Sequence, residues 1–395
     1  MQEYSYNNLD SFLNNWMSNE KYFEMLRLMS QLSKLFSESE VPYLDYRLAE
    51  NLFCKYYEAA NDARSCTAYD ARLKHLGIGI KTFVLKGHNQ NYSVEKIAEF
   101  NRLKKNLNGL TGLGLAKQIS KYRNERMDFA NNQYDVDETQ YHIVGRCEGK
   151  LRIFNTPYEY IDLDSIHVEK DDETSCTFYD DKNLYTFNKS KSVLLKRFDV
   201  PEQHKDILVE ILDDPLSLLE NFFSTANRDI SMAKKQVRGI DYVILPLYSE
   251  NRVKGRFVPE RSGLNQFNAG GRIRNELEVY IPVPRNIHNF FPNFFPSRDV
   301  PFSLLLPDGK ELSAKICQEG GKALMSNPNK ALGEWILRKV LRKDPGNLVT
   351  IDDLDRLGID SVCIEDLHHC NANGLKQYRI SFSNNYENYQ SFIKI

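Results

Sequence analysis

The chain has 395 residues, of which 41% are hydrophobic and 27% charged, with a formal net charge of −2. This length favours two domains over a single core, and the balanced charge argues against a protein that coats nucleic acid along its whole surface. A local basic stripe still allows site-specific DNA binding when acidic residues offset it elsewhere.

The seven cysteines are scattered and include no Cys-x-x-Cys pair. An odd, unpatterned set in a long chain is typical of reduced thiols and predicts a cytoplasmic location. The first residues are polar and acidic, without the basic and apolar regions of a signal peptide. Because no apolar run reaches the length of about eighteen residues that a membrane span needs, we expect no contact with a membrane.

The N-terminal part predicts a domain of mixed helices and strands. Apolar residues at helical spacing predict helices within 9–37 and over Arg47–Ala60, separated by a break at Val41–Tyr43. Two strands are then expected, Ala68–Ala71 and Ile78–Val84, with a tight turn between them. The sequence therefore predicts a helix followed by two strands within its first ninety residues.

The following segment predicts further helices and then a β-rich region. Ser93 can cap a helix that runs to Leu103, and a basic helix is expected over Leu115–Ala130. Residues 141–198 are β-rich, with a hairpin at 178–187. Residues 201–221 are expected to form a helical connector.

We expect a multidomain protein of the α+β or α/β class. Residues 1–215 are assigned to the first domain, 216–239 to a linker and 240–395 to a β-rich second domain.

Three residues of the first domain fit the chemistry of phosphodiester cleavage. Such a site needs two or three carboxylates that converge on Mg²⁺, with a cation near the scissile phosphate. Glu50 is expected on a helix, Asp70 on the first strand and Lys81 on the second. Asp70 would bind the metal, Glu50 would complete or support its shell, and Lys81 would polarise the attacking water or stabilise the phosphate.

This arrangement resembles the PD-(D/E)XK nuclease core of many restriction endonucleases, with one departure. The position two before Lys81, which is acidic in that family, is Gly79. In NgoMIV-type enzymes the acid moves to the following helix, which points to Glu95 or Glu99 here. The resemblance implies Mg²⁺ bound by Asp70, Glu50 and Glu95, and cleavage that leaves 5′-phosphate and 3′-hydroxyl ends.

Two Gly-rich segments of the second domain, Ser262–Arg274 and Gln318–Lys330, are rich in amide and basic side chains. Amide and guanidinium groups read base edges bidentately, so these segments predict DNA recognition. The candidate residues are Asn265, Gln266, Asn268, Arg272 and Arg274 in the first segment, and Gln318, Lys322, Asn327, Asn329 and Lys330 in the second.

The stretch from about Val243 to Phe382 resembles the C-terminal domain of NgoFVII-type restriction endonucleases. That resemblance implies a DNA-binding pseudobarrel whose two arms, formed by the Gly-rich segments, enter the major groove. Apolar residues between the arms are assigned to its core: Val279, Ile281, Phe294, Phe295, Leu304, Leu306, Trp335, Ile336 and Leu337.

Other chemistries find little support in the sequence. The phospholipase-D-like nucleases that commonly accompany this domain need His-x-Lys, and none of the eight histidines has lysine two residues on. No Walker motif or Gly-x-Gly-x-x-Gly occurs, so no nucleotide is expected. His88–Asn91 is better explained as a polar turn than as an HNH site, and His368–Cys370 as a loop than as a zinc site.

The sequence thus predicts a type II restriction endonuclease that cuts double-stranded DNA with Mg²⁺. One active site per chain implies a homodimer or transient pairing on DNA, and a cognate DNA methyltransferase is expected in the same cell. Two alternatives remain open. The chain could be a DNA-binding protein with a degenerate nuclease domain, for which Gly79 is the best evidence. It could also be a nuclease subunit that needs a separate partner.

Overall fold

The computed structural model describes residues 6, 8–62, 68–226 and 242–393. The chain divides into two compact units. The first contains Met1–Met127 and Val136–Gln236, and the second Asp128–Asp135 and Val237–Ile395. Helices and strands are mixed in both, which confirms the α+β class.

Polar side chains cap the first three helices. Asn8 forms a capping box with Ser11 at the start of α1 (Leu9–Asn15). Asn19 caps α2 (Glu20–Gln31), and Asp45 accepts hydrogen bonds from the first turn of α3 (Tyr46–Tyr57). Each cap satisfies backbone N–H groups that the helix itself leaves without partners. The helices predicted within 9–37 and over 47–60 are confirmed.

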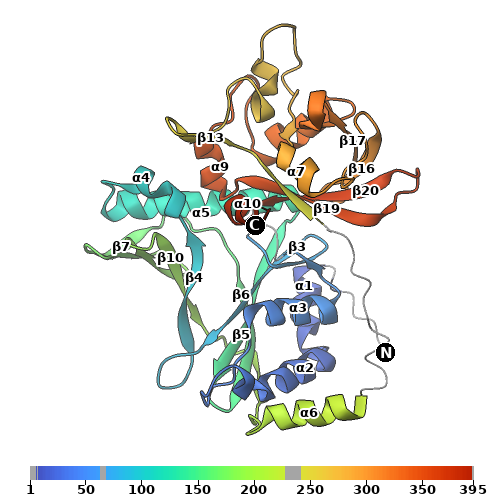
Figure 1. Cartoon of the computed structure of the whole chain (residues 1–395). Coiled ribbons are helices and arrows are strands. Elements are labelled where there is room, and N and C mark those ends of the chain that lie inside the picture. The colour runs from blue at the N-terminus through green and yellow to red at the C-terminus, as the bar shows by residue number, and fades with distance from the viewer. Residues whose placement is uncertain (1–5, 7, 63–67, 227–241, 394–395) are drawn as a thin grey trace. The chain divides into compact units, whose positions relative to one another are not determined.

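A six-stranded sheet forms the centre of the first unit, in the order β1-β2-β3-β5-β6-β11. β3 and β5 run parallel and the other neighbours antiparallel. The helices α1, α2 and α3 gather on one side of it (Figure 1). The strands are β1 (Ala60–Asn61), β2 (Ala71–Leu73), β3 (Leu76–Val84), β5 (Glu138–Cys147), β6 (Lys150–Pro157) and β11 (His204–Leu208).

Strand β3 separates two kinds of environment because successive side chains point to opposite faces. Ile78 and Ile80 belong to the core that the three helices cover. Gly79 and Lys81 lie on the other face. The second predicted strand is confirmed, but the first is displaced: β2 begins at Ala71, so Asp70 precedes the strand.

A five-stranded antiparallel sheet completes the first unit, in the order β4-β10-β9-β8-β7. The predicted helix α5 (Gly112–Tyr134) contributes Leu115 and Ile119 to a core shared with Phe178 and Phe187 of this sheet. The predicted hairpin at 178–187 is also confirmed. The strands are β4 (Tyr92–Glu99), β7 (His167–Asp171), β8 (Ser175–Tyr179), β9 (Leu184–Asn188) and β10 (Val193–Asp199), and the short helix is α4 (Lys104–Leu107).

The helix predicted from Ser93 to Leu103 is wrong. The segment forms strand β4, which pairs with β10 from Tyr92 opposite Asp199 to Glu99 opposite Val193. Ladder hydrogen bonds to a strand about a hundred residues away outweigh a local helical spacing. Only Asn101–Leu103 and the four-residue α4 that follows are helical.

The helical connector predicted over 201–221 is only partly right. His204–Leu208 is strand β11, which pairs antiparallel with β6 at the edge of the six-stranded sheet. The helix in this region is α6 (Pro215–Ala226), whose last five residues extend beyond the predicted segment.

The second unit is built on a seven-stranded sheet in the order β12-β19-β20-β16-β17-β18-β15. All nine residues predicted for its core are buried. The strands are β12 (Tyr242–Pro246), β15 (Ile281–Pro282), β16 (Pro301–Leu305), β17 (Glu311–Cys317), β18 (Ala323–Ser326), β19 (Ser361–Cys370) and β20 (Lys376–Ser383), with a separate hairpin of β13 (Ser249–Asn251) and β14 (Gly255–Phe257). The helices are α7 (Arg285–Phe290), α8 (Lys330–Gly333), the π-helical turn η7 (Glu334–Val340), α9 (Ile351–Leu357) and α10 (Tyr386–Ile393).

None of the helices in the described ranges is long and apolar enough to cross a bilayer.

Candidate functional site

Glu50 is a buried acid on α3, with 5% of its surface exposed. Its Oε2 accepts a hydrogen bond from Nη1 of Arg47, one helical turn earlier, at 3.1 Å. Burial raises the pKa of Glu50 to about 7, and the negative charge of Asp70 adds to the rise, while Arg47 and Lys81 oppose it. The fold therefore holds this carboxyl in a state where its charge is costly at neutral pH.

Asp70 is fixed against β3 by two hydrogen bonds. Its backbone N–H donates to the carbonyl of Ile78 at 2.9 Å, and its Oδ2 accepts from the backbone N–H of Ile80 at 2.8 Å. Burial raises the pKa of Asp70, and Lys81, the Ile80 hydrogen bond and Arg47 act against that rise. Among the described residues no hydrogen bond reaches its other oxygen, Oδ1, which leaves that atom available to a ligand.

Arg47, Glu50, Asp70 and Lys81 thus form one charged group, which we call the α3–β3 cluster. Two acids and two cations come from a helix, from the residue before β2 and from β3. The structure brings together the three residues that the sequence singled out. It adds Arg47, which sequence reasoning missed although its spacing of three residues from Glu50 on a helix was a usable signal.

Gly79 lies where the predicted nuclease core would carry an acid, and the fold leaves no room for one. A Cβ at this position would lie 2.8 Å from the ring of Tyr141 and 3.0 Å from that of Tyr158. These rings stack with centroids 3.9 Å apart, beside the glycine. Any side chain at 79 would have to displace this aromatic pair, so the packing of the sheet excludes an acid at this position.

Glu95 and Glu99, the predicted replacements, lie on a strand rather than a helix. Glu95 accepts a hydrogen bond from Ser93, and Glu99 pairs with Lys96 at 3.1 Å. Neither carboxylate is among the charges that shift the pKa of Glu50 or Asp70. Within the parts of the chain that the structure describes, no three acidic, histidine or cysteine residues are grouped as metal ligands. The structure therefore does not bring the predicted third acid to the cluster.

The first predicted arm contains residues that hold its own shape. Asn265 is fully buried, and its amide donates to the carbonyls of Pro259 and Val349 and accepts from the N–H of Val349. Since every polar atom of this side chain is engaged by backbone, Asn265 cannot read a base. Its assignment to DNA contact is corrected on this ground.

Two arginines of this arm share one acid. Arg272 forks onto the carboxylate of Glu278 at 3.0 and 2.6 Å and keeps 55% of its side chain exposed. Arg274 is only 14% exposed and donates to the carbonyls of Ala269 and Gly270 at 2.7 and 2.8 Å. Arg274 therefore positions the loop, while Arg272 stays accessible. Gln266 is half-buried, and Asn268 is exposed.

The second predicted arm is not one continuous loop. Strand β18 occupies its middle and is hydrogen-bonded between β17 and β15. Gln318 and Lys322 lie before this strand, and a second candidate group follows it: Asn327, Asn329 and Lys330, all exposed. The four residues of β18 hold the two groups about 13 Å apart along the strand. The arm is corrected to two separate turns.

Comparison with protein families supports the DNA-binding assignment of the second unit. Residues 241–367 match the NgoFVII C-terminal B3-like DNA-binding domain. This part of the chain is thus a DNA-binding domain of the NgoFVII restriction-enzyme type. The match ends before α10 and does not include the α3–β3 cluster. No curated protein matches the chain.

Proposed function

We propose that this protein is a type II restriction endonuclease that makes Mg²⁺-dependent double-strand cuts at a specific DNA sequence. Residues 1–215 are its nuclease domain with a PD-(D/E)XK-like fold, 216–239 its linker, and 240–395 its recognition pseudobarrel. The presence of a restriction-enzyme DNA-binding domain at 241–367 supports the class of substrate.

The observation that carries the proposal is that the charges of Asp70 and Lys81 act on the buried Glu50 carboxyl of the α3–β3 cluster, while a hydrogen bond fixes Asp70 to β3. The elements follow in the order α3, β1, β2, β3, β4, α4, α5, β5, with β3 parallel to β5. An acid just before a strand, a strand lysine and a helix acid can supply the parts that a metal-dependent phosphodiesterase needs. An acid and a lysine on an exposed surface would carry no such implication, whereas here both acids are buried at a cost in desolvation and cations nearby oppose that cost.

Glu50 and Asp70 provide a donor set that suits Mg²⁺. In phosphoryl-transfer sites this ion is commonly held by one or two carboxylates, with waters and substrate phosphates completing its shell. Both acids have raised pKa values because they are buried, and a nearby cation stabilises their charged forms. When bound, Mg²⁺ would activate a water molecule and neutralise charge on the phosphate. Glu95 and Glu99 receive no ligand role.

Lys81 and Arg47 place two positive charges beside the carboxylates. The Lys81 ammonium can donate hydrogen bonds to the attacking water or to a phosphate oxygen on which negative charge develops. Arg47 bonds Glu50 while 47% of its side chain is exposed, so its positive charge lies where a DNA phosphate can approach. In the recognition domain the accessible candidates are Arg272, Asn268 and the exposed turn residues around β18.

The test is a cleavage assay with the full chain on unmethylated plasmid and phage DNA, in Mg²⁺ or EDTA. Discrete Mg²⁺-dependent fragments are expected from the wild type and are abolished in Asp70→Ala and Lys81→Ala. Glu99→Ala, which changes an exposed acid on β4, is the matched control and cuts normally. If cutting survives in both cluster variants, the α3–β3 cluster is not the active site.

A non-catalytic DNA-binding protein is the second candidate, and the aromatic pair that fills the space at Gly79 favours it. Specific binding without cutting under any divalent cation would establish that reading. Cutting that appears only after a second protein is added would show a nuclease subunit.

Simultaneous cutting of two strands with one site per chain implies two copies on the DNA. We propose a homodimer or transient pairing, with a DNA methyltransferase protecting the host's sites. Light scattering of the protein with and without a duplex that contains the site measures the number of copies.

A further inference from the structure

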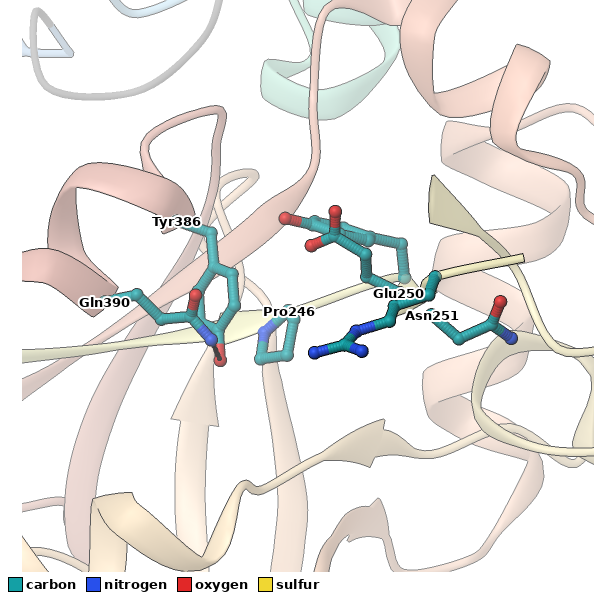
Figure 2. A pocket seen from close by; sticks show the side chains of 7 residues that line it. Pro246, Glu250, Asn251, Tyr386 and Gln390 are labelled. Carbon is teal, nitrogen blue, oxygen red and sulfur yellow. Dashed lines mark hydrogen bonds between the residues drawn. The ribbon is translucent and has the colours of Figure 1, made fainter. Parts of the chain in front are cut away.

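The second unit contains a cavity of about 500 Å³ that neither the predicted arms nor the α3–β3 cluster uses. It lies between the end of β12, the β13–β14 hairpin and α10. Figure 2 shows Tyr386 and Gln390 of α10 on one side of it, Glu250 and Asn251 of the hairpin on the other, and Pro246 between them. Its volume is in the range of pockets that hold small molecules, roughly 300–1,000 Å³.

The walls of the cavity are aromatic and held in place. Tyr248 and Tyr386 are 7% and 6% exposed, and their rings meet edge to face at 6.1 Å and 89°. The guanidinium of Arg256 lies 4.4 Å over the Tyr248 ring and pairs with Asp355 of α9 at 3.5 Å, which fixes that wall. A flat ring entering the cavity can stack on one tyrosine and contact the edge of the other.

The polar groups of the cavity are complementary to the edge of a nucleobase. Oδ1 of Asn251 accepts the N–H groups of Val253 and Lys254 at 3.0 and 2.7 Å, so its amide N–H groups are left as donors. Glu250 supplies a carboxylate acceptor, and Gln390 an amide. The negative charge of Glu250 disfavours a phosphate inside the cavity and favours a neutral ring with an exocyclic amino group.

The rim of the cavity suits the DNA backbone. The turn of the hairpin carries Arg252, Val253 and Lys254, all exposed, and Val253 is 95% exposed. Two cations flanking an apolar tip can contact phosphates while the tip enters the base stack, as apolar wedges do in other DNA-binding proteins. The hairpin belongs to the matched DNA-binding domain, whereas Tyr386 and Gln390 lie beyond it.

We propose that the second unit draws one cytosine or adenine of its bound DNA out of the stack and into this cavity, with Val253 taking its place. Glu250 accepts from the exocyclic amino group, the two tyrosines hold the ring, and Arg252 and Lys254 bind the flanking phosphates. Unstacking a base costs a few kcal/mol, which stacking and hydrogen bonding in the pocket offset. The inference rests on the DNA-binding domain and not on nuclease activity.

The experiment uses the full chain in EDTA, so that cutting plays no part. A duplex is first selected by its binding, and 2-aminopurine then replaces the base next to each adenine or cytosine of the site in turn, so that the candidate base keeps its exocyclic amino group. Fluorescence is expected to rise several-fold at one position when the wild type binds. Gln390→Ala and Glu250→Ala should remove most of this rise, and Val253→Ala should weaken it. Tyr386→Ala should weaken binding about tenfold through lost stacking.

Asn388→Ala is the matched control for Gln390→Ala, because Asn388 is an exposed amide on the same helix, two residues away and outside the cavity. It should bind DNA and raise the fluorescence as the wild type does. Specific binding without a rise at any position would overturn the proposal, as would a rise that persists in both Gln390→Ala and Glu250→Ala. Circular dichroism of each variant shows that a lost signal does not come from unfolding. A chain that selects no duplex would also refute it.

Discussion

Glu50, in the α3–β3 cluster, is a buried acid whose charged form is energetically unfavourable. Its pKa is raised from the ordinary 4.5 to about 7, chiefly by burial. Because the pKa of Glu50 is higher in the folded state than in the unfolded state, protonation of this carboxyl favours folding. Its contribution to the free energy of unfolding is fully present below pH 4.5 and is lost as the pH rises through about 7. A shift of this size corresponds to about 3 kcal/mol of unfolding free energy.

Glu50→Gln should therefore stabilise the metal-free protein while abolishing the proposed DNA cleavage. In EDTA at pH 8 we expect the free energy of unfolding to rise by up to about 3 kcal/mol, because the amide removes a buried charge. At pH 4 the gain should vanish, since Glu50 is then protonated in both states. Urea denaturation at the two pH values measures this, with the exposed Glu99→Gln as a control expected to change little. Equal gains at both pH values would contradict the assigned cause.

Arg272 and Arg274 should behave differently although they are close in sequence. Arg272 is accessible, so Arg272→Ala is expected to weaken specific binding by roughly 1–3 kcal/mol and to relax preference at one base pair if it reads a base. Arg274 binds backbone carbonyls of its own loop, so Arg274→Ala should weaken binding to all sequences. Fluorescence anisotropy at fixed salt, on cognate and scrambled duplexes, separates the two. Identical effects on both duplexes for both variants would refute this division.

At the scale of single elements, sequence reasoning succeeded where the signal is local. The helical apolar spacing predicted α1, α2 and α3, and the run of strand-forming residues around a polar turn predicted the hairpin of β8 and β9. It failed at β4, where Ile97 and Phe100 fit a helix equally well. The structure of that segment is determined by its pairing with β10, which is too distant in sequence for local residue patterns to reveal.

The candidate site divides in the same way. Glu50, Asp70 and Lys81 could be selected from the sequence because the segments that carry them could be predicted separately. Phosphodiester cleavage also calls for acids and a cation, which are the residue types present there. Asn265 was misassigned because a buried amide that bonds its own backbone has the same sequence signature as one that reads DNA. Glu95 was misassigned with the helix that was expected to carry it. The packing that requires glycine at position 79 comes from the rings of Tyr141 and Tyr158, which lie more than sixty residues away in the chain.

Introducing an acid at Gly79, where the PD-(D/E)XK pattern would place one, should damage the fold. In Gly79→Asp a Cβ would lie within 3.0 Å of both tyrosine rings, and the new carboxylate would be buried among them. Forcing a side chain into a packed core typically costs 1–3 kcal/mol, so the melting temperature should fall by several degrees. Gly114→Asp, at a site with open space around its Cβ, is the control and should melt as the wild type does. Increased cleavage in Gly79→Asp would show that the site can accept the acid.

At the scale of the whole molecule, the two units should respond differently to acid. His142 lies fully buried in the first unit, with Tyr22 and Asn155 bonded to its two ring nitrogens at 2.9 and 2.8 Å. Burial lowers its pKa from 6.5 to about 4, against the Asn155 hydrogen bond. The stability that depends on neutral His142 is present above pH 6.5 and is lost as the pH falls through about 4, an effect of about 3 kcal/mol.

The chain holds two tryptophans, Trp16 in the first unit and Trp335 in the second, both buried. Single-tryptophan variants, Trp335→Phe and Trp16→Phe, therefore report on one unit each. Because Glu50 titrates in the opposite sense over an overlapping pH range, both are made in the Glu50→Gln background. Between pH 6.5 and 4 we expect the unfolding free energy reported by Trp16 to fall by about 3 kcal/mol, and that reported by Trp335 to fall less.

His142→Gln tests whether the histidine is the cause, since a glutamine amide does not titrate. In this variant the pH slope seen by Trp16 should flatten above pH 4. Carboxylates that gain stability from ion pairs, such as Asp206 with Arg152, act below that range because their folded pKa lies under the ordinary 3.8. A slope that persists in His142→Gln would assign the acid sensitivity to another group. A Trp335 signal that falls first would show that the second unit is the less stable in acid.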